Sequence, residues 1–174
     1  IVLYDLISIY PITPNMPTYI VKSVADTERG KKVTAYCVGS EPLPDVEEFY
    51  ISDNCIYIYK GDVCRFGADE EGTIHFWHIV YSRGDLQTNN NPFGSSATGF
   101  GGSYGTLESV DCGYISVYIK GPISKIYSVD ANVKVFKKDF AGNINTATIE
   151  QLEAGVNVLI IYYDGTIKAI YQVD

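Results

Sequence analysis

The last sixteen residues, Leu159–Asp174, constrain the fold of this chain more than any other stretch. Residues 159–163 are aliphatic and aromatic, the types enriched in β-strands. The dipeptide Asp164-Gly165 suits a two-residue type I′ turn, in which both central residues take positive φ. The segment therefore predicts a β-hairpin. We expect its second strand to place Ile167, Ala169, Tyr171 and Val173 on one face, and Lys168, Ile170 and Gln172 on the other.

A second copy of this hairpin pattern occurs earlier in the chain, as ISVYIKGPISKIYSVD over Ile115–Asp130. Six positions match the C-terminal copy, namely Gly121, Ile123, Ile126, Tyr127, Val129 and Asp130. Two similar hairpins in one stretch indicate that the C-terminal part forms a small β-sandwich module.

Other apolar or alternating runs predict further strands. Before the middle of the chain they lie at 1–12, 18–24, 32–38, 49–51 and 73–81, with 55–59 and 62–66 as a hairpin about Lys60-Gly61. Later strands are expected at 114–119, 123–129 and 133–140. The one helical candidate is 147–155, where Thr148 and Gln151 fit a capping box and Gly155 fits a C-terminal cap, although a short strand and turn would also suit it.

Residues 87–105 are rich in Gly, Ser and Asn and show no periodicity. Such a stretch is uncommon inside a compact domain, so we expect a connector or surface loop there. It divides the chain into an N-terminal β-sandwich-like domain (1–86) and a C-terminal module (106–174).

The overall composition excludes some classes of protein. The net charge of −8 disfavours binding to phosphate backbones, so no nucleic-acid partner is expected. No apolar run is long enough for a membrane-spanning helix, and the N-terminus lacks the features of an intact signal peptide. The cysteines at 37, 55, 64 and 112 allow three full disulfide pairings or remain free thiols.

The sequence shows no catalytic or metal-binding constellation. His75 and His78 are the only histidines, and positions three apart on a strand point to opposite faces. No cysteine has the spacing of a zinc site. We therefore expect no enzyme, no metal and no cofactor.

Candidate interaction residues come from two features. The first is the tripeptide Arg83-Gly84-Asp85, which would be an adhesion motif if exposed and is otherwise a charged turn. The second is the abundance of tyrosine, with 15 residues, because tyrosines on a sheet face can stack on sugars or form protein interfaces. We assign this role to Tyr57, Tyr59, Trp77, Tyr162 and Tyr163. The alternative is that these side chains only cover the sheets.

Residues 113–174 resemble the C-terminal sorting domain of the type IX secretion system of Bacteroidetes. The residues that carry this resemblance, in order, are Ile126-Tyr127, Val135-Phe136, Thr148-Ile149, Leu152, Ala154-Gly155-Val156, Leu159-Ile160-Ile161, Asp164-Gly165 and Val173. The resemblance implies an immunoglobulin-like sandwich and a role in export, with the specific function in residues 1–110.

These observations predict an all-β protein of two small β-sandwich modules, the C-terminal one immunoglobulin-like. The expected function is that of a non-catalytic structural or adhesive protein, secreted or at the cell surface, with a protein partner or self-assembly. Two alternatives remain open, a carbohydrate-binding module that uses exposed tyrosines and a structural subunit of a fibre or viral assembly.

Overall fold

The fold was analysed in a computed structural model. It describes residues 17–38, 46–52, 57–83, 85–86, 100–119, 123–129, 132–163 and 166–173. The expected strand at 1–12, residues Cys55 and Gly84, and the turn residues Asp164-Gly165 lie outside the described residues.

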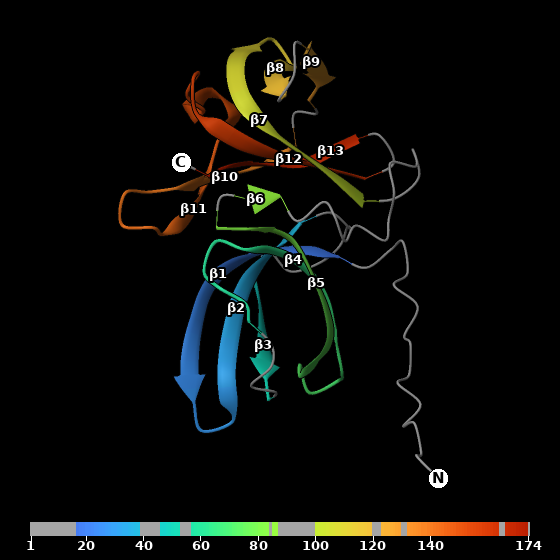
Figure 1. The fold of residues 1–174 in the computed structure, drawn as a ribbon, viewed down its shortest axis with the longest axis vertical. Helices are drawn as coiled ribbons and strands as arrows, with labels where there is room; N and C mark the ends of the chain where they lie inside the picture. Colours follow the sequence, from blue (N-terminus) through green and yellow to red (C-terminus); the bar gives the residue numbers. More distant parts are fainter. Residues whose placement is uncertain are drawn as a thin grey trace.

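The described residues form thirteen strands in two sheets, which Figure 1 shows as two layers, one above the other. The N-terminal sheet consists of β1 (Thr18–Thr27), β2 (Gly30–Val38), β3 (Val46–Ile51), β4 (Val63–Ala68), β5 (Ile74–Ser82) and β6 (Asp85–Leu86). The C-terminal sheet consists of β7 (Phe100–Asp111), β8 (Tyr114–Ile119), β9 (Ile123–Ser128), β10 (Lys134–Lys138), β11 (Ile144–Ala147), β12 (Asn157–Tyr163) and β13 (Thr166–Gln172). The predicted all-β, sandwich-like fold is confirmed.

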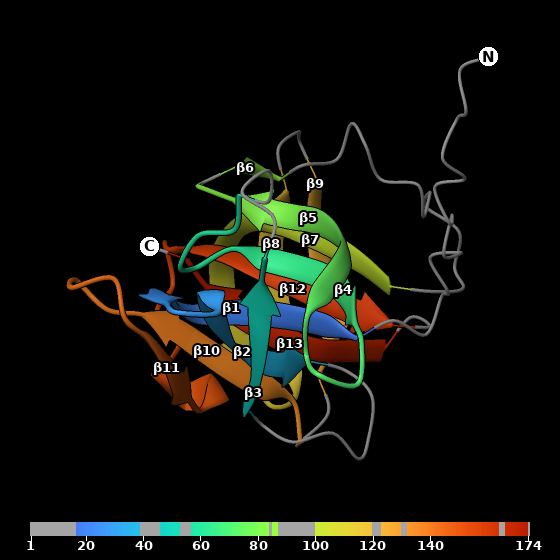
Figure 2. The ribbon, with the colours of Figure 1, turned by 90° about the horizontal axis from the view of Figure 1, so that it is seen from below.

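The N-terminal sheet has the order β3-β2-β1-β4-β5-β6. Its β1–β2 hairpin turns at Gly30, whose φ of +112° is rarely adopted by residues with a side chain. The sheet curls so that β3 approaches the turn between β4 and β5. There the Tyr50 backbone N–H donates to the Gly72 carbonyl at 2.8 Å. In Figure 2 this sheet is seen from below, with the C-terminal sheet behind it.

The C-terminal sheet has the order β11-β10-β13-β12-β7-β8-β9. Its pairings are antiparallel except for the parallel pair of β10 and β13. The two similar hairpins pair in the same register away from the turn, since Ile115 lies opposite Tyr127 and Leu159 opposite Tyr171. Their positions differ, because β13 is inside the sheet and β9 is at its end.

Three apolar clusters hold the molecule together. A shared core lies between the sheets and includes Ile20 and Val63 from one sheet and Leu159 and Tyr171 from the other. The N-terminal core lies on the other face of the N-terminal sheet, and the C-terminal core lies on the other face of the C-terminal sheet. Alternation along a strand explains how one element supplies two cores, as when Cys37 enters the N-terminal core and Val38 the shared core.

The structure corrects the expected faces of the last strand. Tyr162 pairs with Ile167 and Ile161 pairs with Ala169, so Lys168 is the extra residue of a β-bulge. The bulge turns Ile167 into the C-terminal core together with Ile170, while Ala169 and Tyr171 face the shared core. The strand is buried on both faces, because one face packs in the shared core and the other in the C-terminal core.

Three other local expectations differ from the structure. Residues 100–105, placed in the connector, are the first half of β7. The expected hairpin about Lys60-Gly61 is wrong, because Tyr57–Tyr59 are not in a strand and β4 pairs instead with β1 and β5. The helical candidate contains only one 3-10 turn, η2 (Ile149–Gln151), although Gln151 does accept a hydrogen bond from the Thr148 backbone as the capping box predicts, at 2.9 Å.

Candidate functional site

The proposed interaction residues of the N-terminal sheet divide into an exposed group and a packed one. Tyr57 and Tyr59 lie in the exposed segment before β4, and the Arg83 guanidinium sits 3.8 Å from the centre of the Tyr59 ring. Of the tripeptide at 83–85, Arg83 is exposed and has a φ of +52°, and the backbone of Asp85 starts β6. Trp77 is half-buried and packs against the N-terminal core.

Tyr162 and Tyr163 do not add to an exposed surface that the structure describes. Tyr162 is half-buried against the C-terminal core, and the side chain of Tyr163 is outside the described residues. The predicted residues therefore lie at several places, and Tyr59 and Arg83 are in contact with each other.

The two histidines have separate environments. The exposed His75 ring bonds through Nε2 to the Asp69 carboxylate at 2.8 Å. His78 is half-buried on β5, where burial and then the nearby Arg65 charge lower its pKa. Among the described residues, no three His, Cys, Asp or Glu side chains gather closely enough to hold a metal ion.

The three described cysteines are free thiols. Cys37 and Cys64 are buried, and burial raises the pKa of Cys64 well above its usual range. Cys112 is exposed at the two-residue turn between β7 and β8. Cys112 and Gly113 both have positive φ there, as a type I′ turn requires.

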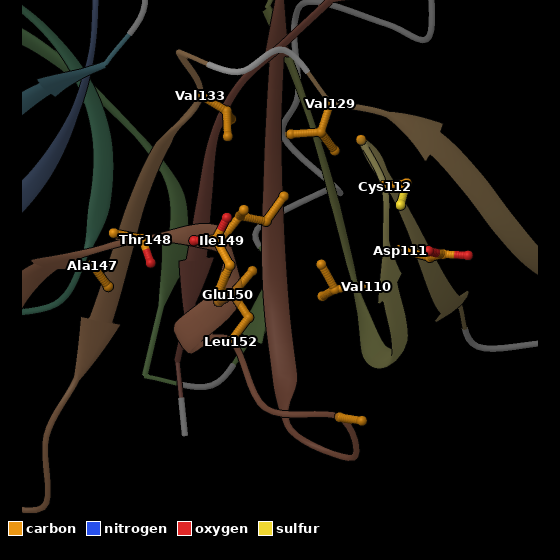
Figure 3. A pocket seen from close by; sticks show the side chains of 12 residues that line it. Val110, Asp111, Cys112, Val129, Val133, Ala147, Thr148, Ile149, Glu150 and Leu152 are labelled. Carbon is orange, nitrogen blue, oxygen red and sulfur yellow. The ribbon is translucent and has the colours of Figure 1, made fainter.

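A pocket of about 910 Å³ opens at one end of the C-terminal sheet. In Figure 3, Val110, Asp111 and Cys112 of the β7–β8 turn lie on one side of it, Ala147 and Thr148 on the other, with η2 between them. The described lining residues are Val110, Asp111, Cys112, Gly113, Val129, Val133, Ala147, Thr148, Ile149, Glu150, Leu152 and Ala154. The pocket is an extension of the C-terminal core, since Leu152 and Val129 belong to both.

The polar groups of the pocket favour binding over nucleophilic chemistry. The Asp111 carboxylate accepts a hydrogen bond from the Cys112 thiol and raises its pKa, so the sulfur stays a neutral thiol at pH 7. The Thr148 hydroxyl beside Glu150 lowers the pKa of that carboxyl, which is therefore ionised at pH 7. The pocket thus presents the ionised Glu150 carboxylate and a protonated thiol.

Next to this turn, β8 and β9 expose large side chains on their outward face. Tyr114 and Tyr118 of β8 are 55% and 44% exposed, and Ile126 of β9 is 74% exposed. Ile126 pairs with Ser116, which places it on the same face as both tyrosines. The Ser116 hydroxyl donates to Glu108 at 2.7 Å, and hydrogen bonds from Ser116 and Ser124 lower the pKa of that carboxyl.

Sequence reasoning did not select Tyr114, Ile126 or the pocket. The Cys112-Gly113 dipeptide was the available signal for the β7–β8 turn, but the sequence predicts no strand over 106–111 that could pair with 114–119 across it. Ile126 was noted only as a repeat position, and its exposure depends on β9 being an end strand.

Comparison with known proteins gives no match to a family model, to a curated protein or to a solved structure. In the described part of the chain, no helix has the length and apolar character needed to cross a membrane. The functional interpretation therefore rests on the geometry of this chain.

Proposed function

We propose that the protein is a non-catalytic structural module that associates with a second copy of itself through strand β9. The observation that carries this proposal is the position of Ile126, 74% exposed in the middle of a six-residue end strand. An end strand has unpaired backbone donors and acceptors and is a template for pairing with another chain. An exposed apolar residue at its centre adds a hydrophobic contact to such a pairing.

The other three end strands are less suited to this role. In β3, the backbone N–H of Tyr50 already donates a hydrogen bond to the Gly72 carbonyl. β6 has two residues, and β11 has four, with Asn145 and Thr146 exposed. Of the described end strands, β9 has the most exposed apolar side chain, because Ile126 is 74% exposed and Val46 of β3 is 39% exposed.

The residues around Ile126 fit a two-fold antiparallel pairing. Ser124 and Ser128 flank it on the outward face, so that face of β9 has no charge to desolvate. Pairing centred on Lys125 would place two like charges opposite each other, which is unfavourable. Pairing centred on Ile126 instead places the two isoleucines side by side, with Lys125 opposite Tyr127 of the second copy.

The experiment is light scattering coupled to size-exclusion chromatography over a range of concentrations. We expect the wild type to form a dimer and Ile126→Lys to be monomeric, because the lysines would meet across the two-fold axis. Val46→Lys is the matched control, since Val46 is an exposed apolar residue on β3. A wild type that stays monomeric at high concentration contradicts the proposal, as does an Ile126→Lys variant that still dimerises.

The location and the export role are further parts of the proposal. A secreted or cell-surface structural module would be consistent with the acidic chain and with the resemblance of residues 113–174 to a type IX sorting domain, including an immunoglobulin-like fold. Appending residues 113–174 to a reporter in a bacterium with that secretion system tests the export role. A reporter retained inside the cells would contradict it.

Carbohydrate binding is the second candidate, because two exposed tyrosines share one face of β8. Tyr114 and Tyr118 are four residues apart, about 13 Å along a strand, with Ser116 and Glu108 between them. Rings of this kind can stack on sugars, and the hydroxyl and carboxylate can bond to them. A glycan array that gives no signal with the wild type rejects this candidate, while a signal lost in a Tyr114→Ala/Tyr118→Ala variant supports it.

A further inference from the structure

The turn between β10 and β11 presents a fully exposed aromatic ring. Phe140 is 114% exposed, the highest value among the large apolar side chains that the structure describes. Figures 1 and 2 both show this turn projecting beyond the two layers of the molecule. A ring in this position is free to enter a cavity of another molecule.

The backbone of this turn is held in one conformation by hydrogen bonds to Asp139. The Asp139 carboxylate accepts from the Asn143 backbone N–H at 2.7 Å, and from the side-chain amides of Asn143 and Asn145 at 3.1 and 3.4 Å. The Asp139 carbonyl accepts from the Gly142 N–H at 2.8 Å. A turn that is already ordered loses little conformational entropy when it binds.

The pocket beside η2 has the lining and the size to receive such a ring. Seven of its twelve described lining residues are aliphatic, among them Val129, Val133 and Leu152. Its volume of about 910 Å³ is ample, because a closed apolar cavity of about 150 Å³ already holds benzene. A bound ring would extend the C-terminal core, to which Val129 and Leu152 belong.

Phe140 cannot fill the pocket of its own chain. The pocket residues Val133 and Ala147 lie at one end of the β10–β11 hairpin, and the turn that carries Phe140 lies at the other. The five residues of β10 separate the two ends by about 16 Å. The ring and the pocket can therefore meet only between two copies.

The charges beside the turn and beside the pocket are of opposite sign. Lys60 donates to the turn residue Asn143 at 2.8 Å, and Lys138 is exposed at the start of the turn, so two positive charges stand against the one carboxylate of Asp139. The pocket opening carries the exposed Glu150, which is ionised at pH 7. Opposite charges favour the approach of the turn to the pocket.

We propose that Phe140 of one copy enters the pocket beside η2 of a second copy. The two surfaces are different, so the contact is heterologous and links copies in series. Pairing through β9 alone ends at a dimer, whereas the Phe140 contact joins such dimers into larger assemblies. A contact built on one ring is small and weak, so it is almost unpopulated at the concentrations used in chromatography.

The test uses Ile126→Lys, in which pairing through β9 is absent. Isotope-labelled Ile126→Lys/Phe140→Ser keeps the pocket but lacks the ring, and it is titrated with unlabelled Ile126→Lys and followed by NMR. We expect progressive shifts of Val129, Val133 and Leu152 with a Kd on the order of 1 mM. Unlabelled Ile126→Lys/Phe140→Ser is the matched control and should cause none. The absence of shifts with the Phe140 copy, or shifts outside the pocket, overturns the proposal.

A cross-link provides a second readout. Cys112 is an exposed thiol among the pocket residues, and Ala141 is exposed next to Phe140. In a Cys55→Ser/Ile126→Lys background, a short bismaleimide should join Ala141→Cys to Cys112 of another copy, as identified by peptide mass spectrometry. Adding Phe140→Ser should abolish this cross-link. Equal yields with and without Phe140 overturn the proposal.

The β9 contact and the Phe140 contact fail separately. Phe140→Ser alone should still form the dimer in light scattering, because β9 is unchanged. At high concentration, sedimentation velocity should detect assemblies larger than a dimer in the wild type and none in Phe140→Ser. Larger assemblies that persist in Phe140→Ser overturn the role of this ring and leave the β9 proposal standing.

Discussion

Asp62 is a buried carboxylate that organises the turn before β4. It is 1% exposed, and its carboxylate accepts hydrogen bonds from the Ser82 hydroxyl at 2.6 Å and from the Tyr59 backbone at 2.8 Å. Its backbone carbonyl also accepts from Val21 at 2.9 Å, which fixes the turn to β1. Burial raises the pKa of this carboxyl despite those hydrogen bonds. Asp62 thus holds the exposed Tyr59 in place at a cost in charge desolvation.

Replacing Asp62 with Asn should destabilise the protein, because one carboxylate oxygen becomes an NH2 group, so the Ser82 hydroxyl or the Tyr59 backbone N–H loses its charged acceptor. We expect the free energy of unfolding, measured with urea at pH 7, to fall by about 1–3 kcal/mol. Asp26→Asn, at an exposed position of β1, is the control and should change it by less than about 0.5 kcal/mol.

The same variant predicts a pH dependence. The folded pKa of Asp62 is raised above the unfolded value of about 3.9, so the folded state holds the proton more tightly. The wild type therefore loses stability from this group as the pH rises from about 4 through the folded pKa, and Asp62→Asn does not. The difference in free energy of unfolding between the wild type and Asp62→Asn should therefore shrink over that pH interval. A difference that grows with pH would contradict a raised pKa of Asp62 in the folded state.

At the scale of elements, β7 shows why a Gly-rich stretch is not always a connector. Gly105 pairs with Ile119 of β8, and a Cβ at this position would overlap the Tyr118 carbonyl oxygen and lie 2.8 Å from Cγ1 of Val117. Gly101 and Gly102 pair with Tyr162 and Ile161 of β12. Glycine is used here where neighbouring strands come close, which is a known role of glycine in strands.

Gly105→Ala is therefore expected to destabilise the C-terminal sheet by about 1–3 kcal/mol, the cost of overpacking a tight site. Ser103→Ala, two residues earlier on the same strand, is the control and should cost less than about 0.5 kcal/mol. Thermal unfolding followed by circular dichroism measures both variants. Equal stabilities of the two would show that β7 does not pass β8 this closely.

The elements that the sequence predicted well are those with clear periodicity. The strand expected at 114–119 matches β8, and the one expected at 73–81 matches β5 within a residue. β7 was missed in its first half because glycines and serines give no apolar alternation. β11 was missed because Ile144 is its only buried residue.

Pairing partners were harder to predict than strands. The two similar hairpins adopt the same register, yet Ile170 is fully buried and its counterpart Ile126 is 74% exposed. The difference comes from which face of each hairpin is covered, since Ile170 packs in the C-terminal core whereas in the first hairpin Ile115 and Tyr127 face that core and Ile126 faces away from it. This is a long-range property that local pattern does not contain. The pocket and the exposed face of β8 and β9 could not be predicted for the same reason.

At the scale of the whole molecule, the two sheets are joined by apolar and polar contacts. Tyr171 and Phe136 of the C-terminal sheet pack in the shared core with Tyr36 of the N-terminal sheet. Hydrogen bonds also cross between the sheets, from the Tyr36 hydroxyl to the Ile144 carbonyl at 3.3 Å and from Lys60 to Asn143 at 2.8 Å. The shared core leaves β9 at the end of the C-terminal sheet, away from the N-terminal sheet.

The most direct test of association through β9 is a cysteine cross-link at its centre. Ile126→Cys is made in a Cys55→Ser/Cys112→Ser background, so that the remaining native thiols described are the buried Cys37 and Cys64. In an antiparallel pairing centred on residue 126, the two Cα atoms lie about 4.5–5.5 Å apart, within the range of a disulfide. Mild oxidation should then give a covalent dimer on a non-reducing gel, while Val46→Cys in the same background stays monomeric. An Ile126→Cys variant that remains monomeric, or that cross-links no better than Val46→Cys, would contradict the account.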